Sequence, residues 1–417
     1  MDVVEFLKEE KFLMEEMFSR IARETRRNVF SQLGKSNLSI VYGLRGTGKT
    51  TLLAQKYFEI EENEEKGIRR LAIHGEHLNI AGYRIKDLIP SLKYILSEGY
   101  LFIDEITSIK NWPEEIKILS DMYPKLKIIV TGSSAVDLQE ARKILARRAV
   151  FINLKPLTLN EFLRIKYKTE IIPFDPFAED KLTNALRTEL DAREKLKDIE
   201  KIIIEYKRMN LPYLIESPTS TLLDVIERVI YEDIGGTGSF SEDVLNKFKP
   251  LLKLLALSEK ISYDNLSRDV GIGKGTVIKM LDYLSKANLI KPIYPYSKGK
   301  GKVRKEPKYL FTSPIIRDVL LDLIGEKESG RGLIREDLFA INIEREELFY
   351  LPKGPDYVWR NYLFEIGGAS KGREQFKDLE VLEIKSNFSG KYIIHEGLQI
   401  SSGEVFKLPF YVFLSYF

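Results

Sequence analysis

Residues 38–55 read LSIVYGLRGTGKTTLLAQ, and this stretch decides the fold of the chain around it. Its first five residues form a short, apolar and β-branched run that is typical of a buried strand, and the residues from Lys49 onward follow a helical pattern. Between them, residues 43–50 match G-x-x-x-x-G-K-[ST] at every specified position. Strand, glycine-rich loop and helix form the context in which this motif binds phosphate, so the sequence predicts a nucleoside-triphosphate site.

The residue types in this loop suit a polyanionic ligand. Glycines let the backbone curl so that its N–H groups point at phosphate oxygens, and the next helix presents its positive N-terminal end to the same anion. We expect Lys49 to contact the β- and γ-phosphates of ATP and the Thr50 hydroxyl to ligate Mg²⁺. The complete motif and its flanks disfavour the alternative, a turn that binds nothing. The predicted nucleotide-binding residues are Gly43, Leu44, Arg45, Gly46, Thr47, Gly48, Lys49, Thr50 and Thr51.

A second apolar run, GYLFIDEI at residues 99–106, ends in two acids. Ligands bind at the carboxyl ends of parallel strands, so we expect Asp104 to hold Mg²⁺ through water and Glu105 to act as the general base on the attacking water. A surface turn would also place two acids after a strand. The phosphate loop about 55 residues upstream favours the catalytic interpretation.

A third strand, KLKIIVTGSS at residues 125–134, is expected to end beside the same site. It would bring Thr131, Ser133 and Ser134 near the terminal phosphate. The pattern does not identify which of the three senses that phosphate, and we take Ser133 as the candidate catalytic residue.

These elements together resemble the core of the AAA+ superfamily. More narrowly, they resemble ATPases of archaea and bacteria that carry a C-terminal DUF4143-type domain with a restriction-endonuclease-like fold. The resemblance spans residues 38–163 and rests on four features in the family's order. They are G-x-R-x-x-G-K-T at 43–50, Asp-Glu followed by Trp112, Thr-Gly-Ser-Ser at 131–134, and Arg148 eight residues before PLTLNEFL at 156–163.

The resemblance implies hydrolysis of ATP to ADP and phosphate, and a homo-oligomer that is a dimer or a ring. It favours Arg148 as a residue that reaches the γ-phosphate bound by a neighbouring subunit. Here Arg147 replaces the glycine that the family usually has before this arginine, so either arginine is a candidate. The alternative is equally open: Arg148 lies on the surface or pairs with an acid of its own chain.

Length and composition limit what the rest of the chain can be. With 417 residues, about two to four domains are expected. The chain has 65 Lys and Arg against 62 Asp and Glu, so any attraction to nucleic acid must come from a local basic patch. There are no cysteines, which excludes disulfides, thiolate metal sites and cysteine catalysis. Abundant Lys and Glu without Cys also suit a thermophile.

The N-terminal sequence MDVVEFLKEEKFLMEEMF is too acidic for a secretory signal. No apolar run approaches the roughly 20 residues that cross a bilayer, so we expect a soluble cytoplasmic protein without a membrane partner. The apolar residues of this segment lean toward one helical face, which predicts a helix docked on the next domain. They are Val4, Phe6, Leu7, Phe12, Leu13 and Met17.

The pattern from residue 243 onward is helix, turn, helix, tight turn, helix, and then two strands around a basic loop. This resembles a winged helix. Seven Lys or Arg and one acid lie between Lys291 and Lys308, which favours DNA as a partner. A protein-docking module, or lysines that are only solvated, is the alternative. The candidate DNA contacts are Lys274, Thr276, Lys279, Lys298, Lys300, Lys302 and Arg304.

The last hundred residues resemble the nuclease-like domain of the same family. Such nucleases use acids on a bent hairpin and a nearby lysine to bind Mg²⁺ and orient water. The candidates are Glu336, Asp356, Glu365 and Lys371. The expected Glu-x-Lys is broken after Glu365, so we expect a nuclease-like fold with cleavage weakened or absent. Binding of DNA ends, branched DNA or another protomer is the alternative.

The predicted fold is α/β: a P-loop AAA+ core with a parallel sheet, followed by a helical lid, a winged helix and a small α/β nuclease-like domain. The predicted boundaries are 1–34 for an N-terminal helical segment, 35–155 for the AAA+ core, 156–242 for the lid, 243–325 for the winged helix and 326–417 for the nuclease-like domain. The leading functional hypothesis is an AAA+ ATPase that couples hydrolysis to DNA processing or remodelling. A slow ATP switch that signals through its winged helix and an ATP-controlled nuclease are the alternatives.

Overall fold

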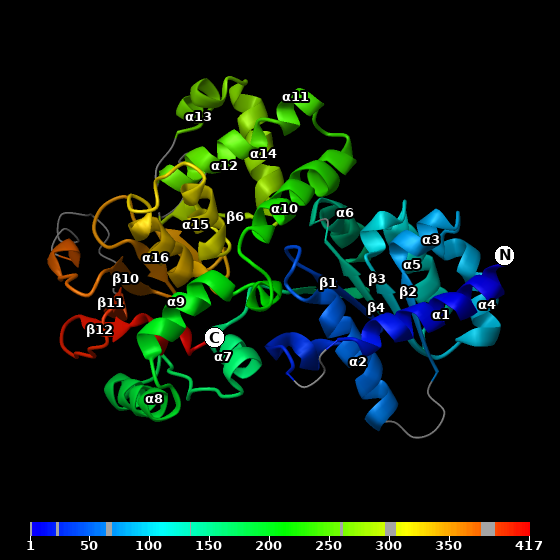
Figure 1. The fold of residues 1–417 in the computed structure, drawn as a ribbon, viewed down its shortest axis with the longest axis horizontal. Helices are drawn as coiled ribbons and strands as arrows, with labels where there is room; N and C mark the ends of the chain where they lie inside the picture. The colour runs from blue at the N-terminus through cyan, green and yellow to red at the C-terminus, as the bar shows by residue number, and fades with distance from the viewer. Residues whose placement is uncertain are drawn as a thin grey trace. The chain divides into compact units, whose positions relative to one another are not determined.

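A five-stranded parallel sheet forms the core of the N-terminal part of the chain in the computed structural model (Figure 1). The strand order is β2-β3-β4-β1-β5. Strands are present within the predicted stretches 38–42, 99–106 and 125–134, and two more strands lie at the edges of the sheet. The strands are β1 Leu38–Tyr42, β2 Arg70–His74, β3 Gly99–Asp104, β4 Leu126–Gly132 and β5 Ala149–Asn153.

The structure describes residues 2–21, 25–63, 69–133, 135–258, 262–296, 306–376 and 388–417. The chain divides into two units. The first consists of Met1–Lys155 and Tyr231–Ser239, and the second of Pro156–Ile230 and Phe240–Phe417. The chain therefore passes from one unit to the other three times.

Both faces of the parallel sheet are covered, as its continuous apolar strands require. Successive residues of each strand point to opposite faces, so that Ile103 belongs to one hydrophobic cluster and Phe102 to the other. Helices α4 and α5 contribute to the first cluster and α2 to the second. The helices of this unit are α1 Val3–Ser19, α2 Lys49–Asn63, α3 Gly75–Ile80, α4 Ile85–Ile95, α5 Trp112–Met122 and α6 Ala135–Leu145.

Helix α1 packs along the edge strand β2, so the predicted docking of an N-terminal helix is confirmed. The predicted face is only partly right, because Val4, Phe12 and Leu13 are exposed. The buried face includes a charged residue, Glu10, which the apolar pattern does not reveal. Its carboxylate accepts hydrogen bonds from the backbone N–H of His74 (2.8 Å) and lies 3.0 Å from the Nδ1 atom of His77. The buried residues are Phe6, Leu7, Glu10, Met14 and Phe18.

The second unit is built on a seven-stranded mixed sheet of order β12-β11-β10-β9-β8-β6-β7. Strands β8, β9 and β10 are antiparallel, whereas β10, β11 and β12 run parallel. The strands are β6 Ile290–Pro295, β7 Lys308–Phe311, β8 Leu348–Tyr350, β9 Tyr357–Trp359, β10 Tyr362–Gly367, β11 Gly390–His395 and β12 Phe406–Pro409.

Helices from the region interpreted as a lid share one hydrophobic core with this sheet. Phe162 and Tyr206 belong to the same cluster as Phe364 and Phe413. Residues 231–239 are the part of the interpreted lid that groups with the first unit. The helices of this region are α7 Leu159–Tyr167, α8 Lys181–Lys195, α9 Ile199–Met209 and α10 Thr221–Arg228, and a π-helical turn follows at Val229–Ile234.

The helices and two strands predicted after residue 243 are present. The third main helix buries Val277, Met280, Leu281 and Leu284, whereas Ile278 is exposed. Strands β6 and β7 form an antiparallel hairpin, and β6 also pairs in parallel with β8. The hairpin therefore continues into the C-terminal sheet. The helices are α11 Glu242–Leu245, α12 Phe248–Leu257, α13 Tyr263–Val270 and α14 Lys274–Lys286.

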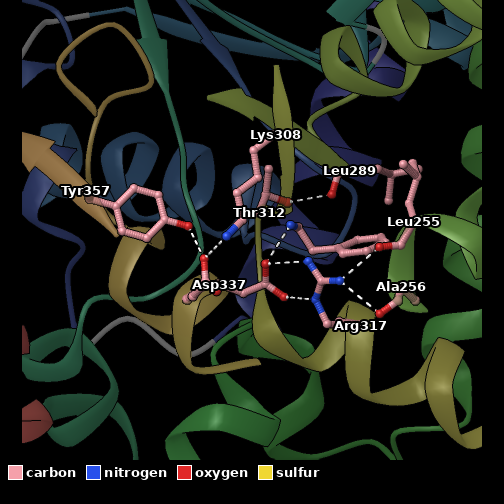
Figure 2. A network of polar contacts seen from close by, with 10 residues as sticks. Leu255, Ala256, Leu289, Lys308, Thr312, Arg317, Asp337 and Tyr357 are labelled. Atoms are coloured by element: carbon pink, nitrogen blue, oxygen red, sulfur yellow. Dashed lines mark hydrogen bonds and ion pairs between the residues drawn. The ribbon is translucent and has the colours of Figure 1, made fainter. Parts of the chain in front are cut away.

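A buried ion pair joins four elements of the second unit (Figure 2). Arg317 and Asp337 are fully buried and pair at 2.5 Å between Nε and Oδ2. Arg317 also donates to the carbonyl oxygens of Leu255 (2.9 Å) and Ala256 (3.0 Å) at the end of α12, while the N–H of Phe311 in β7 donates to Asp337. Arg317 lies on α15 and Asp337 on α16. The remaining helices are α15 Pro314–Asp322, α16 Arg331–Ala340 and α17 Phe410–Leu414.

Candidate functional site

The phosphate loop has the backbone geometry that its glycines predict. Gly46 and Gly48 adopt φ angles of 82° and 89°, which are left-handed conformations that favour glycine. A Cβ atom on Gly43 would lie 2.3 Å from the carbonyl oxygen of Leu154, so no side chain fits there. Helix α2 begins at Lys49 and directs its N-terminal end toward the loop. The loop thus forms a concave surface of backbone amides that suits phosphate oxygens.

Lys49 is held inside this loop. Its ammonium group is buried and donates to the carbonyl oxygens of Gly43 (3.2 Å) and Leu44 (3.4 Å). Burial lowers the pKa of Lys49, and the carboxylates of Glu105 and Asp104 oppose that shift. A buried cation bound only to carbonyl oxygens and near two carboxylates is well placed to receive an anionic phosphate.

The two residues predicted to hold Mg²⁺ lie together. The Thr50 hydroxyl donates to Oδ2 of Asp104 at 2.7 Å, and the Thr131 hydroxyl donates to the other carboxylate oxygen. Burial raises the pKa of Asp104, while these hydrogen bonds act in the opposite direction. A hydroxyl and a carboxylate are hard oxygen ligands of the kind that Mg²⁺ uses together with water and phosphate oxygens. The residues present therefore fit a magnesium ion bound with a nucleotide.

Glu105 occupies a restricted backbone position directly after β3. Its φ angle of 50° is left-handed, and its N–H donates to the Thr131 hydroxyl at 3.0 Å. The Ser133 hydroxyl donates to Oε2 of Glu105 at 3.0 Å. Gly75 packs against this turn so closely that a Cβ there would lie 2.4 Å from the Glu105 carbonyl oxygen. Strained positions of this kind cluster at functional sites, and here the strain sets the direction of a carboxylate.

The structure adds detail to the three residues predicted at the end of β4. Thr131 contacts both Asp104 and Glu105, whereas Ser133 contacts the carboxylate of Glu105. Ser134 lies outside the described residues. Ser133 is therefore bonded to the carboxylate that we predict to be the general base, a contact that the sequence pattern did not indicate.

Arg148 forms an ion pair within its own chain. Its Nε and Nη2 atoms donate to the two carboxylate oxygens of Asp121, at 2.8 and 3.1 Å. Both side chains are solvent-exposed, and such pairs are weak enough to exchange partners. The pairing alternative is thus observed in this chain, and a role toward a neighbouring subunit stays a prediction.

Two further residues at the phosphate loop carry no motif and were not predicted. Arg27 donates to the carbonyl oxygens of Thr47 (2.8 Å) and Lys155 (2.7 Å), and so ties the loop to the residues after β5. Asp233 pairs with Arg45 of the loop at 2.7 Å. Burial raises the pKa of Asp233, and the hydrogen bond from Arg45 opposes that shift. Asp233 is 188 residues from its partner, so no local pattern could reveal the contact.

The predicted DNA contacts are only partly within the described structure. Lys274 pairs with Asp264 at 2.8 Å, and the Lys279 ammonium lies 4.8 Å from the centre of the Phe240 ring. Thr276 is half-buried near the start of α14. Exposed ion pairs are weak, so Lys274 would still be available to a phosphate group. Lys298, Lys300, Lys302 and Arg304 lie outside the described residues.

The predicted nuclease-like residues lie close together in the second unit. Lys371 pairs with Glu365 at 2.5 Å, and the carboxylate of Asp356 accepts a hydrogen bond from the N–H of Ile366 at 2.7 Å. Burial raises the pKa of Asp356 to about 7, helped by the nearby charges of Glu336 and Glu365.

Lys308 and Tyr357 complete this cluster and were not predicted. Both donate to the carboxylate of Glu336, Lys308 from β7 and Tyr357 from β9. Figure 2 labels the two donors. Two of the three acids are therefore paired with lysines of the same chain. Among the residues that the structure describes, no group of three His, Cys, Asp or Glu side chains is arranged to hold a metal ion.

Comparisons with known proteins match an ATPase-type family model to the part of the chain that contains this site. Residues 35–163 match a family model described as an AAA domain, and residues 214–326 match a domain of unknown function, DUF8612. An uncharacterized protein of Methanocaldococcus jannaschii is 30% identical over 419 residues, which cover 91% of this chain and 85% of that protein. An uncharacterized protein of Haemophilus influenzae is 23% identical, over 88% of this chain and 92% of that protein.

Among solved structures, the Walker-type ATPase of Pyrococcus abyssi is 17% identical, with a TM-score of 0.41. The match covers 71% of this chain and 96% of that one. In the part of the chain that the structure describes, no helix is both long and apolar enough to span a membrane.

Proposed function

This chain, with its AAA domain, belongs to the same family as the Methanocaldococcus jannaschii protein, and on that premise we propose that it is a cytoplasmic Mg²⁺-dependent ATPase that couples ATP hydrolysis to DNA processing or remodelling. The observation that carries the proposal is the arrangement of Thr50, Asp104 and Glu105 beside the phosphate loop. It supplies a phosphate cradle, a pair of Mg²⁺ ligands and a general base within one site.

Each residue of the site has a distinct part in hydrolysis. The loop amides and Lys49 bind the β- and γ-phosphates. Thr50 and Asp104 would hold Mg²⁺, which would neutralise charge on the phosphate oxygens. Glu105 accepts a proton from a water molecule as the water oxygen attacks the γ-phosphorus. The bond between that phosphorus and the bridging oxygen breaks, and ADP and phosphate leave. Ser133 keeps the Glu105 carboxylate directed toward the water.

The three helices and hairpin after residue 243 support a DNA-binding role. Their order is that of a winged helix, and the segment between Lys291 and Lys308 carries seven Lys or Arg and one acid. Contacts from such a segment to phosphates release counterions, so affinity for DNA should fall steeply as salt rises. Among the described helices, α14 would approach a groove of the DNA with its exposed first residues, which include Lys274.

The C-terminal sheet is proposed as the nuclease-like, DUF4143-type domain, with cleavage weakened or absent. The support is electrostatic, because Lys308 pairs with Glu336 and Lys371 pairs with Glu365. Two acids that a cleaving enzyme would turn toward a metal ion are thus neutralised within the chain. Among the described residues, the buried Oε2 atom of Glu365 has no hydrogen-bond partner, and this observation favours an ATP-controlled nuclease as the second candidate function.

The ATPase proposal also includes assembly into a dimer or ring, in which Arg148 would leave Asp121 and reach the γ-phosphate bound by its neighbour. The exposed position of both residues supports this role. The assembly is tested by sedimentation of the full chain with and without nucleotide. The two arginines are tested by ATP turnover and nucleotide binding of the wild type, Arg148→Ala and Arg147→Ala. Loss of turnover in Arg148→Ala with unchanged nucleotide binding would support Arg148. Equal turnover in all three proteins would count against both arginines.

ATP turnover tests the functional proposal directly. It should be measured without DNA and with duplex, single-stranded and junction DNA. A DNA-remodelling ATPase should exceed about 0.01 turnovers per second, a rate typical of slow switch GTPases, and DNA should increase the rate. A rate that stays low and does not respond to DNA would favour the alternative, a slow switch. Incubation of junction DNA with Mg²⁺ or Mn²⁺ in the same series would reveal nuclease activity.

A further inference from the structure

An ion pair connects the phosphate loop to a segment 188 residues later in the chain. Arg45 donates from Nη2 to Oδ1 of Asp233 at 2.7 Å and from Nε to Oδ2 at 3.1 Å. Glu232 lies 3.1 Å from the same guanidinium group. Asp233 is 8% exposed and Glu232 is 55% exposed, so Asp233 is the buried partner with two-point geometry. This geometry makes it the stronger of the two contacts.

The carboxylate of Asp233 binds an arginine of the loop that we propose holds the phosphates of a nucleotide. Arg45 belongs to the glycine-rich loop, and the charges that act on Asp233 include those of Lys49 and Glu105 as well as Arg45. Asp233 is therefore within electrostatic reach of the catalytic residues. A nucleoside triphosphate carries more negative charge than one carboxylate, so the two anions compete for the Arg45 guanidinium.

The segment that carries Asp233 has a position and a backbone suited to movement. Residues 231–239 group with the first unit, while the chain on both sides of them belongs to the second. The segment begins within the π-helical turn Val229–Ile234, a rare conformation that is frequent at functional sites. It continues through Gly236 and Gly238, around which a Cβ would meet no neighbouring atom. The space around these two glycines is therefore open, while the Arg45 ion pair and the buried side chain of Ile234 hold the start of the segment on the first unit.

We propose that Asp233 is a positioning residue for Arg45 and that the pair is a latch which nucleotide opens. Without nucleotide, Asp233 holds Arg45 and fixes residues 231–239 on the first unit. When a triphosphate binds, Arg45 turns to the phosphate oxygens, and the segment is released. Since both ends of the segment continue into the second unit, its release couples nucleotide binding to the conformation of that unit. This inference rests on the proposed ATPase function and specifies how it is regulated.

Hydrogen–deuterium exchange on the full chain tests the latch without relying on turnover. Peptides that cover residues 229–239 are followed with and without a non-hydrolysable ATP analogue and Mg²⁺. In the wild type, the analogue should increase their exchange severalfold. Asp233→Asn should exchange rapidly in both conditions and bind the analogue severalfold more tightly, because the competing charge is gone. Arg45→Gln should also exchange rapidly in both conditions but bind the analogue more weakly.

Two matched variants separate the latch from a loss of structure. Glu232→Gln removes the exposed neighbour and should behave like the wild type, and Asp233→Glu keeps the charge and should retain nucleotide-dependent exchange. Intact binding of a fluorescent ATP analogue with unchanged exchange in 229–239 would overturn the latch and leave the ATPase proposal standing. Weaker nucleotide binding by Asp233→Asn would also overturn it. A wild type that binds no nucleotide would contradict both proposals.

Discussion

At the scale of single residues, the ATPase site is a set of hydrogen bonds around two adjacent carboxylates. Thr50 and Thr131 donate to Asp104, and Ser133 donates to Glu105. The two acids are thereby given different surroundings: one is buried among hydroxyl groups, and the other follows a strained turn at the end of β3. Environments that differ in this way allow neighbouring acids to perform different tasks, and the proposed tasks here are metal binding by Asp104 and proton transfer by Glu105.

Replacing Glu105 by Gln should separate binding from hydrolysis. The amide keeps the size of the side chain but accepts no proton, so kcat should fall by about 10²–10⁴-fold. Nucleotide affinity, measured by calorimetry, should change little. Lys49→Ala is the comparison, because loss of the buried ammonium removes a phosphate contact and should abolish detectable binding. A Glu105→Gln protein with wild-type turnover would assign the base elsewhere.

Ser133→Ala should lower kcat about tenfold without a change in KM, since a hydrogen bond to a charged group contributes about 1.5–3 kcal/mol. The control is Ser108→Ala, because the Ser108 hydroxyl donates to the backbone carbonyl oxygen of Glu105 and does not touch its carboxylate. Steady-state kinetics of the two variants distinguish orientation of the base from support of the turn. Equal effects on kcat would argue against a specific role for Ser133.

The sequence predicts this site well because its residues lie in local motifs. Strand, loop and helix at 38–55 are contiguous, and the chemistry of phosphate and Mg²⁺ leaves few residue types for the key positions. Contacts over long sequence distances were not predicted. Asp233 contacts Arg45, and Lys308 on β7 contacts Glu336 on α16, but an isolated acid or lysine in a helical or basic stretch carries no signal of its partner.

At the scale of secondary structure elements, buried polar contacts determine how the helices and strands of the second unit are joined. Arg317 on α15 contacts the end of α12 through two carbonyl oxygens and contacts α16 through Asp337. The Phe311 N–H binds the same carboxylate from β7. Glu336, the next residue along α16, receives Lys308 and Tyr357. One turn of α16 therefore positions both the ion pair and the acidic cluster.

Asp337→Ala should destabilise the second unit by about 3–5 kcal/mol, since it leaves a fully buried arginine without its counterion. Urea unfolding followed by circular dichroism measures the loss. Removing both charges with Arg317→Met and Asp337→Leu should cost less than the single change, because no unpaired charge remains. Glu328→Ala, which breaks an exposed pair with Arg331, should change stability by no more than about 1 kcal/mol.

His395 on β11 should make stability depend on pH. Burial lowers the pKa of His395, whose Nδ1 accepts a hydrogen bond from the Gly397 N–H while Nε2 lies 3.0 Å from the Gln399 carbonyl oxygen. In the unfolded chain the imidazole titrates near about 6.5. Below that pH the unfolded state binds a proton that the folded state resists, so the contribution of His395 to stability falls as the pH decreases.

The comparison that isolates this effect is wild type against His395→Gln at each pH from 7.5 to 5. The raised pKa of Asp356, at about 7, acts in the opposite sense, because the folded state then binds more protons than the unfolded state. Both proteins share that contribution, so it cancels in the difference. The stability advantage of the wild type over the variant should shrink toward pH 5. A difference that does not change with pH would exclude a buried neutral imidazole.

The helical pattern predicted that α1 buries one face, but it did not predict every residue on that face. The buried face includes Glu10, whereas Phe12 and Leu13 are exposed. A periodic apolar pattern tolerates a shift of one position, because a helix rotated by part of a turn still buries most of its apolar residues. Tertiary contacts, such as the one from Glu10 to the end of β2, decide the final rotation.

At the scale of the whole molecule, the sequence indicated which segments fold but not which segments share a core. The helices between residues 157 and 206 have amphipathic patterns, and such a pattern shows that a face is buried without identifying what covers it. In the structure these helices pack with the C-terminal sheet, and the β6–β7 hairpin is paired with that sheet through β8. The segments predicted as a lid, a winged helix and a nuclease-like domain therefore contribute helices or strands to the same sheet and core in the second unit.

DNA affinity tests the function of the whole molecule, because the chain has almost no net charge and binding must depend on a local patch. Each phosphate contact changes the slope of log K against log salt by about 0.9. Replacing Lys298, Lys300, Lys302 and Arg304 together by Ala should reduce that slope by up to about 3.6, as measured by fluorescence anisotropy on duplex DNA.

The control replaces four exposed lysines elsewhere, Lys35, Lys86, Lys110 and Lys197, and removes the same total charge. If the control lowers the slope as much, the attraction comes from net charge and not from the wing. If only the variant of residues 298–304 does, phosphate contacts are concentrated in that short stretch of sequence, which shortly precedes β7 and its Lys308, the partner of Glu336.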